Sequence, residues 1–262
     1  MSHLSSQSDE CFILVKAQPH RSSNYFETVC CAGIGRDGKW RRQYPVPFRI
    51  LDPTQRFGRW QWIEYRFSTS PRDQRRESQK VIPESIRLKA TLKRSERPSF
   101  LNPLVRSSLR DADARSESLA IVRPRSFEFS WKRKTERELS DERVKHAALA
   151  SQLSMFDRTA KPLEPCPFQF EVRWVDQDGA DHRHVSDDWE SAQAFRNFRS
   201  SLGEKAALPA LRDKYLDYFE RGLVFAFSTH KRRNTTRGMP NQWLLVGMIR
   251  LDDSPQADLF LS

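Results

Sequence analysis

The first half of the chain alternates apolar and polar residues with the period of a β-strand. The alternation is clearest at residues 60–67 and 85–93, and apolar runs at residues 12–17 and 26–34 predict two buried strands. An Asp-Gly pair, which adopts positive φ at low cost, predicts a hairpin turn that leads into a third strand at residues 40–44. These strands predict a small, mostly antiparallel and barrel-like β domain.

The segments around these strands carry weaker signals. Residues 1–10 are polar and predict a frayed end. Two prolines within residues 44–49 cannot donate to a strand ladder, so we expect the chain to leave the sheet there. Further strands are predicted at residues 119–124 and 126–131, and we expect both to return to the β domain.

The second half of the chain mixes strand and helix patterns. It predicts a hairpin, two helices with apolar stripes and two apolar strands, the last of which is apolar on both faces and is expected to be central in its sheet. Their residue ranges, in chain order, are 168–174 with 182–185, 187–202, 208–221, 223–229 and 243–249.

Helix and proline signals between the two halves predict a domain boundary. A capping box at residues 135–138 predicts a helix start, and three prolines within residues 162–167 then interrupt the chain. The fold class is therefore α+β, with a basic, small barrel-like β domain followed by a smaller α+β domain. The predicted segments are residues 1–134 for the basic β domain, 135–167 for a helical linker, 168–252 for the α+β domain and 253–262 for a tail.

Positive charge is concentrated in the first half. The formal net charge is +11; residues 1–134 hold 27 Lys and Arg against 14 Asp and Glu, whereas residues 135–262 hold 18 against 20. Such a field attracts polyanions, of which nucleic acid is the commonest. The alternative is a charge that serves solubility alone.

Several classes of protein are disfavoured by what the sequence lacks. The four cysteines include no CxxC pair, and no apolar run reaches the roughly 18 residues of a membrane span. No signal peptide is recognisable, so we expect a cytoplasmic, reduced location. No Walker loop, GxGxxG, GxSxG or HExxH motif is present, and we predict no cofactor and no metal.

Arginine and tryptophan are interleaved between residues 41 and 62, and basic residues recur in later loops. Arginines bind phosphates, and exposed aromatic rings stack on bases. The alternative is that Trp60 and Trp62 share the core face of a strand. The predicted nucleic-acid-binding residues are Arg41, Arg42, Arg49, Arg56, Arg59, Trp60, Arg72, Arg75, Arg76, Lys132, Arg133, Lys134, Lys231, Arg232 and Arg233.

Weaker candidates for catalysis fall into two groups. A carboxylate near a thiol and a phenol can perform acid–base or nucleophilic chemistry, which singles out Glu27, Cys30, Tyr44 and Glu64; His230 lies at a predicted strand end beside a basic loop. Equally, each of these residues can be structural. His182 and His184 are two apart on a strand with Asp187 and Asp188 nearby, but no third metal ligand is identifiable.

Two short peptides follow one pattern: Gln, an apolar residue, Ser or Asp, then Leu and Phe. They are residues 152–156 (QLSMF) and 256–260 (QADLF). Both resemble the peptide with which bacterial replication and repair proteins dock on the sliding clamp, with departures at Met155 and Ala257. The alternative is that their apolar residues pack on this protein's own core. The predicted clamp-binding residues are Gln152, Leu153, Met155, Phe156, Gln256, Leu259 and Phe260.

Four further segments resemble an uncharacterised bacterial family whose members are associated with defence or DNA-handling gene neighbourhoods. They are residues 26–30 (FETVC), 44–49 (YPVPFR), 188–190 (DWE) and 230–247, which ends in WLLVG. This resemblance implies a soluble bacterial protein and no particular activity.

Together these patterns predict a nucleic-acid-binding accessory protein, with DNA favoured, that is tethered to the sliding clamp and serves anti-phage defence or repair. A separate partner enzyme would fit this role. Two alternatives remain open: a nuclease or base-processing enzyme, and a scaffold that binds protein only.

Overall fold

The computed structural model describes residues 6–18, 28–69, 73, 75–154, 163–229 and 242–252. The chain forms two compact units, one of Met1–Leu92 with Arg133–Pro167 and one of Lys93–Lys132 with Phe168–Ser262. We call them the barrel unit and the two-sheet unit. None of the helices in the described residues combines the length and the apolar character needed to cross a bilayer.

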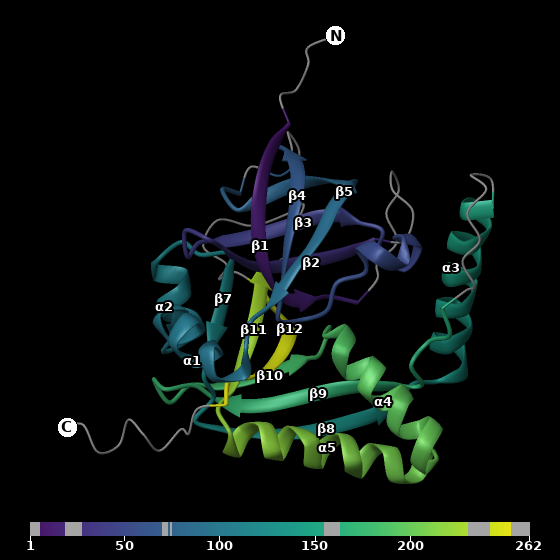
Figure 1. Cartoon of the computed structure of the whole chain (residues 1–262). Coiled ribbons are helices and arrows are strands. Elements are labelled where there is room, and N and C mark those ends of the chain that lie inside the picture. Colours follow the sequence, from purple (N-terminus) through teal and green to yellow (C-terminus); the bar gives the residue numbers. More distant parts are fainter. Residues whose placement is uncertain are drawn as a thin grey trace. The chain divides into compact units, whose positions relative to one another are not determined.

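The barrel unit is built on a closed barrel of five strands in the order β1-β2-β3-β5-β4 (Figure 1). All neighbouring pairs are antiparallel except β3 and β5, which run parallel. This confirms the predicted α+β class and the barrel-like N-terminal domain. The strands are β1 (Gln7–Lys16), β2 (Val29–Gly35), β3 (Trp40–Val46), β4 (Gln61–Ser68) and β5 (Ser78–Thr91).

Two local predictions for this barrel are wrong. Gln7–Glu10 are not frayed but begin β1, where Asp9 pairs with Tyr65 of β4. The polar run is tolerated because one of its side chains, Asp9, finds partners inside the barrel. β3 does not end before its proline but continues to Val46, which pairs with Val29 across a register shift that leaves an extra residue on β3 next to the proline.

The connection between β3 and β4 consists of two short 3-10 turns, η1 (Phe48–Ile50) and η2 (Pro53–Gln55). The Gln55 side-chain nitrogen donates to the carbonyl oxygens of Pro83, Glu84 and Ile86, each at 3.2 Å. These bonds hold the connection against β5.

A long polar helix, α3 (Glu136–Ser154), follows β8 in the chain. The predicted capping box at its start is confirmed: Thr135 N donates to the Glu138 carboxylate at 2.7 Å, and Glu138 N donates to Thr135 Oγ1 at 3.3 Å. Leu139 is its buried anchor in the first turns.

The two-sheet unit contains a three-stranded sheet in the order β10-β9-β8 and a four-stranded sheet in the order β12-β11-β7-β6. In the described residues, four short helical elements and two longer helices accompany them. The strands are β6 (Val105–Arg106), β7 (Leu119–Val122), β8 (Ser126–Arg133), β9 (Phe168–Val175), β10 (Asp181–Val185), β11 (Leu223–Thr229) and β12 (Trp243–Arg250). The helical elements are η3 (Arg94–Glu96), α1 (Arg97–Leu101), η4 (Asn102–Leu104), α2 (Leu109–Ala114), α4 (Trp189–Leu202) and α5 (Glu204–Glu220).

The strands predicted at residues 119–124 and 126–131 do not return to the barrel. β7 pairs with β11, and β8 lies beside β9, so residues 93–132 group with the second half of the chain. The prediction of a central position for residues 243–249 is also wrong, because β12 lies at an edge of its sheet. Its apolar character fits the observed burial of both faces, and a bridge from Ser186 to Leu245 covers part of the open edge.

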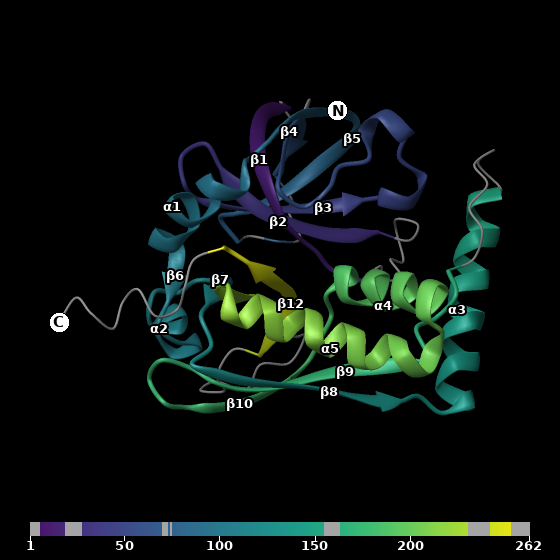
Figure 2. The same ribbon diagram turned by 60° about the horizontal axis from the view of Figure 1, so that its bottom comes forward.

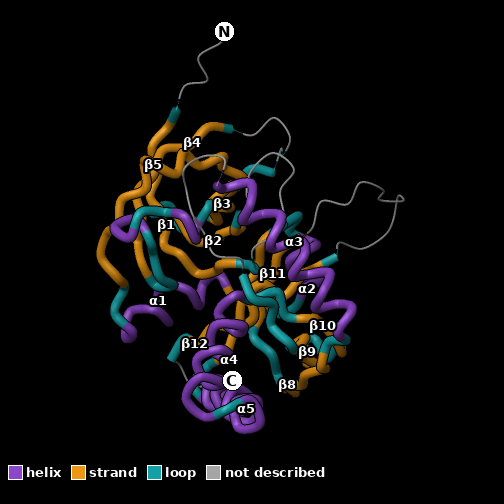
Figure 3. Tube along the Cα trace, turned by 90° about the vertical axis from the view of Figure 1, so that its right-hand side faces the viewer, coloured by secondary structure: helices purple, strands orange, loops and turns teal. Residues whose placement is uncertain are grey.

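Aromatic side chains form the core between α4, α5 and the three-stranded sheet. Phe129 of β8 contacts Tyr215 of α5 at 5.0 Å between ring centroids, and Phe195 of α4 contacts Phe168 and Phe170 of β9 at 5.4 and 5.8 Å. The two helices lie side by side over this sheet, as Figure 2 and, from another side, Figure 3 show. Gly203 separates them and ends α4 with a φ of 80°, a conformation that glycine adopts at low cost.

Candidate nucleic-acid interface

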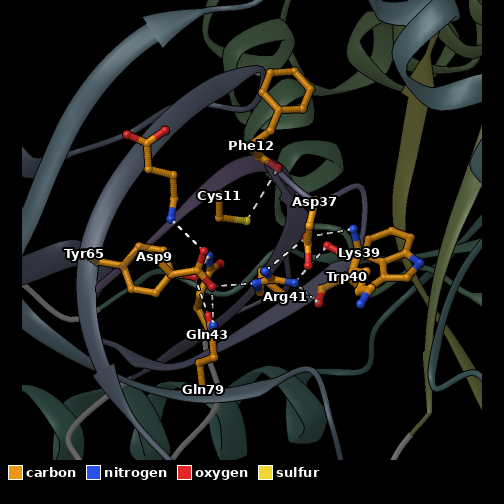
Figure 4. A network of polar contacts seen from close by, with 11 residues as sticks. Asp9, Cys11, Phe12, Asp37, Lys39, Trp40, Arg41, Gln43, Tyr65 and Gln79 are labelled. Atoms are coloured by element: carbon orange, nitrogen blue, oxygen red, sulfur yellow. Dashed lines mark hydrogen bonds and ion pairs between the residues drawn. The ribbon is translucent and has the colours of Figure 1, made fainter. Parts of the chain in front are cut away.

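A network of polar side chains lies inside the barrel and connects four of its strands (Figure 4). Arg41 Nε of β3 bonds to Asp9 Oδ2 of β1 at 2.6 Å, and Gln79 of β5 donates to the same carboxylate oxygen at 2.7 Å. Tyr65 of β4 donates to Gln79 Oε1 and accepts from Gln43 at 3.1 Å. The barrel is therefore held from within by oriented hydrogen bonds as well as by apolar packing.

The pKa shifts of the groups in this network favour a structural role over a catalytic one. Burial raises the pKa of Tyr65 and of Cys11, so both groups are neutral at physiological pH. Burial alone would lower the pKa of Arg41, but its hydrogen bonds to Asp9 and Asp37 raise it. Arg41 is thus a permanent cation already matched by carboxylates, and neither the thiol nor the phenol is activated as a nucleophile.

The hairpin between β2 and β3 carries the next basic groups. Arg36 Nε bonds to Glu10 at 2.6 Å, and its guanidinium carbon lies 3.7 Å from the centroid of the Trp62 ring. Gly38 has a φ of 72°, which confirms the predicted Asp-Gly turn. Lys39 is exposed beside this turn.

An aromatic and basic surface lies on the outside of the parallel pair β3 and β5. Tyr44 of β3 is 39% exposed, and its direct neighbour across the pair is Lys80 of β5, also exposed. Arg76 is exposed in the connection that leads into β5. We call Tyr44, Arg76 and Lys80 the β3–β5 face. It combines one partly exposed ring with two exposed cations.

The structure disperses the other predicted nucleic-acid-binding residues of the barrel unit. Arg41 points into the barrel, and Arg42 is buried with its guanidinium 3.6 Å from Glu77, so we no longer assign phosphate binding to either. Arg75 is bonded to Asp73, and Lys134 to Glu142 at 2.8 Å. Arg72 lies outside the described residues.

A second group of these residues surrounds a hollow of about 380 Å³ beside η1 and η2. Arg49 and Arg56 line it, and Arg56 donates to the carbonyl oxygens of Leu51 and Arg49 at 3.1 and 3.4 Å. Arg59 and Trp60 are half-buried; Trp60 has a φ of 73°, and its ring centroid lies 5.9 Å from that of Phe12. Trp62 is buried, but it alternates with Ile63 and Tyr65 of β4, and its ring lies beside Phe12 at 5.5 Å between centroids.

Five basic candidates remain, two of which the structure describes and three of which it does not. Lys132 and Arg133 are exposed at the end of β8. Lys231, Arg232 and Arg233 lie outside the described residues.

The three catalytic candidates that lie within the described residues do not form one cluster. Cys30 of β2 is half-buried and Tyr44 is exposed, whereas Glu64 of β4 is bonded to Lys89 at 2.7 Å, with β5 between it and β3. Glu27 and His230 lie outside the described residues. We therefore build no activity on this set.

The paired histidines of β10 have partners other than the aspartates expected from spacing. His182 Nε2 is 2.8 Å from Asp176 Oδ2, and His184 Nδ1 accepts from Trp174 Nε1 at 3.1 Å. Burial and the neighbouring His182 lower the pKa of His184 to about 4. Asp188 instead caps α4. In the described residues no group of three His, Cys, Asp or Glu is placed to hold a metal ion.

The two clamp-like peptides fall at the limits of the described chain. Gln152 and Leu153 belong to the end of α3. Met155 and Phe156 follow it and lie outside the described residues, as do Gln256, Leu259 and Phe260.

The fold defines a two-unit α+β protein whose N-terminal part contains a five-stranded barrel. Residues 7–107 match the model of a domain of unknown function, DUF8758. Residues 103–262, more than half of the chain, match the model of a second domain of unknown function, DUF8757, and the chain belongs to that family. No curated protein matches the sequence.

Sequence reasoning missed the surface formed by Tyr44 and Lys80. The sequence singles out Tyr44 only as a catalytic candidate, because its pairing with Lys80 depends on a parallel contact between strands far apart in the chain. Tyr44 is exposed in a strand of otherwise mostly buried residues, and no two-residue period in the sequence indicates that exposure.

Proposed function

We propose that this chain is a nucleic-acid-binding accessory protein, with DNA favoured, that works in the cytoplasm and contacts nucleic acid through its barrel unit. The strand order β1-β2-β3-β5-β4 is that of a five-stranded Greek-key barrel of the OB type. Such barrels bind oligonucleotides on the face of strands 2 and 3 and on the loops that join strands 1 to 2 and 4 to 5. This likeness concerns strand order alone and does not imply binding. We infer nucleic-acid binding from the side chains on the barrel surface.

The observation that carries the proposal is the exposed Tyr44 ring beside Lys80 on the third and fifth strands, with Arg76 in the connection from the fourth strand. A ring accepts stacked bases of any sequence, and the two cations attract the flanking phosphates. The barrel unit also holds 23 Lys and Arg against 15 Asp and Glu, so its overall field favours a polyanion.

Substitution of Tyr44 by Ala tests the stacking role. Loss of one base–aromatic stack costs about 1–3 kcal/mol, so we expect an affinity for single-stranded DNA that is lower by about fivefold to 150-fold. Fluorescence anisotropy with a labelled oligonucleotide measures this change.

Tyr44→Phe is the matched control, because it keeps the ring and removes only the hydroxyl. We expect its affinity to stay close to that of the wild type. Equal affinity of Tyr44→Ala and the wild type would remove the stacking platform from the proposal.

We further propose that residues 152–156 and 256–260 tether the protein to the sliding clamp during anti-phage defence or repair. What supports this is the pattern that the two peptides share, together with the position of the first at the end of a mostly exposed polar helix. A tether of this kind raises the local concentration of the barrel unit on newly copied DNA without any new contact to DNA.

A double substitution, Phe156→Ala with Phe260→Ala, tests the tether. We expect purified clamp to be retained by the immobilised wild-type chain and lost with the double variant, while affinity for free DNA is unchanged. Nuclease treatment before capture is the control, since retention that depends on DNA would argue against a direct peptide contact.

A further inference from the structure

A second basic surface lies in the two-sheet unit, where the end of α5, the end of β12 and the start of η3 and α1 come together. It consists of five cations around two carboxylates. We call it the arginine patch, and its members are Arg94, Arg97, Lys214, Arg221 and Arg250 with Asp217 and Asp252.

Three of the arginines are linked in a chain by the two aspartates. Asp217 accepts from Arg221 Nε at 2.7 Å and from Arg250 Nη1 at 2.9 Å. Asp252 contacts Arg250 Nε at 2.8 Å and Arg94 Nε at 3.4 Å. Because each carboxylate is shared between two guanidinium groups, the aspartates orient the arginines but do not neutralise them.

An aromatic ring lies within this group of charges. Tyr218 of α5 is half-buried, with the Arg250 guanidinium carbon and the Lys214 ammonium each 5.4 Å from its ring centroid. Both cations are within the range of a cation–π contact, which helps to fix their positions on the surface.

The patch keeps an excess of positive charge that is open to solvent. Its five cations face three anions, the two aspartates and Glu220, the last of which also acts on Arg221. The side chains of Arg94 and Arg221 are 64% and 60% exposed. Burial, and then repulsion from Arg94 and Arg250, lower the pKa of Arg97 against the opposing effect of Asp252. An anion placed here would relieve that repulsion.

We propose that the arginine patch is a second phosphate-binding surface of this chain for nucleic acid; this inference rests on the proposed function. Guanidinium groups held in fixed orientations match the paired oxygens of successive phosphates better than flexible lysines do. The patch therefore adds sequence-independent affinity through the nucleic-acid backbone.

The double variant Arg94→Ala with Arg221→Ala tests the patch in the full-length chain. Each lost phosphate contact lowers the steepness of log K against log salt by about 0.9, so we expect the slope to fall by about 2 and binding at about 100 mM salt to weaken roughly tenfold. The probe is a labelled DNA 20-mer, single- and double-stranded.

Two comparisons make this result specific. Arg199→Ala with Arg212→Ala removes the same charge from α4 and from the α5 face opposite Lys214 and Arg221. We expect its affinity for DNA to fall by less than twofold. Arg94→Lys with Arg221→Lys keeps the charge but loses the guanidinium geometry, so we expect a loss of affinity that is measurable but smaller than that of the alanine pair. This variant guards against a loss caused by misfolding.

The outcomes separate this inference from the proposed function. If Tyr44→Ala weakens binding but the patch variant binds like the charge-matched control, the patch claim is overturned and the barrel claim stands. If the patch variant loses binding to polyglutamate while its DNA affinity is unchanged, the surface serves an acidic protein partner instead, and the inference is wrong.

Discussion

Gly33→Ala is expected to lower the free energy of unfolding by about 3 kcal/mol, the upper end of the usual cost of overpacking. A Cβ at this position in β2 would lie 2.0 Å from the Phe12 carbonyl oxygen and 2.7 Å from Cys11 Sγ of β1. The first neighbour is backbone in the paired strand, so the clash is relieved only if β1 and β2 move apart. Urea unfolding followed by tryptophan fluorescence measures the change.

Gly58→Ala is the matched control in the same unit. A Cβ there meets no atom within 4 Å, and Gly58 is not among the glycines with positive φ. We expect no loss of stability, and a gain of up to about 1 kcal/mol from the lower entropy of the unfolded chain. Equal urea midpoints for Gly33→Ala and Gly58→Ala would show that the close approach of β1 and β2 does not constrain the barrel.

Charge reversal of the β3–β5 face, Arg76→Glu with Lys80→Glu, is expected to weaken DNA binding by about 100-fold at about 100 mM salt, or ~2.7 kcal/mol. Both side chains are exposed, so the substitutions replace two attractions to phosphate by two repulsions without disturbing the core. The salt dependence should become shallower by about 2 in the log–log slope. Anisotropy titrations at several salt concentrations give both quantities.

Arg87→Glu with Lys89→Glu makes the same change in net charge further along β5. Arg87 bonds to the backbone carbonyls of Glu84 and Ile86, and Lys89 pairs with Glu64, so both have roles apart from the β3–β5 face. We expect a loss of affinity several times smaller than that of the first pair. If both pairs weaken binding equally, net charge and not the β3–β5 face determines affinity.

The sequence predicted the features that depend on local pattern. The two-residue period of residues 60–67, the Asp-Gly turn before β3 and the capping box of α3 each specify their element through neighbouring residues, and each is found in the structure. The barrel-like form followed from several short strands in a row with turn signals between them.

The errors arose where long-range pairing decides the outcome. β7 and β8 carry ordinary strand patterns, and nothing local indicates that their partners are β11 and β9, separated from them by about a hundred and about forty residues of chain. β12 is apolar on both faces because side chains cover both, yet it lies at the edge of its sheet. Burial and position in a sheet are separate properties.

The candidate site shows the same limit. Arg41 reads as a surface cation because arginine is seldom buried, but Asp9, which the sequence placed in a frayed end, holds it inside the barrel. The arginine patch joins residues near positions 95, 217 and 251, so only the folded chain reveals it. A count of charges along the sequence assigned the positive excess to the first half and gave no sign of this surface.

The salt dependence of DNA binding by the wild-type chain tests the central claim most directly. The association constant for a labelled 20-mer would be measured between about 50 and 300 mM salt. Phosphate contacts from the β3–β5 face and the arginine patch predict a straight log–log plot with a negative slope of about 3 or more. A flat plot, or no binding at the lowest salt with micromolar protein, would contradict the account.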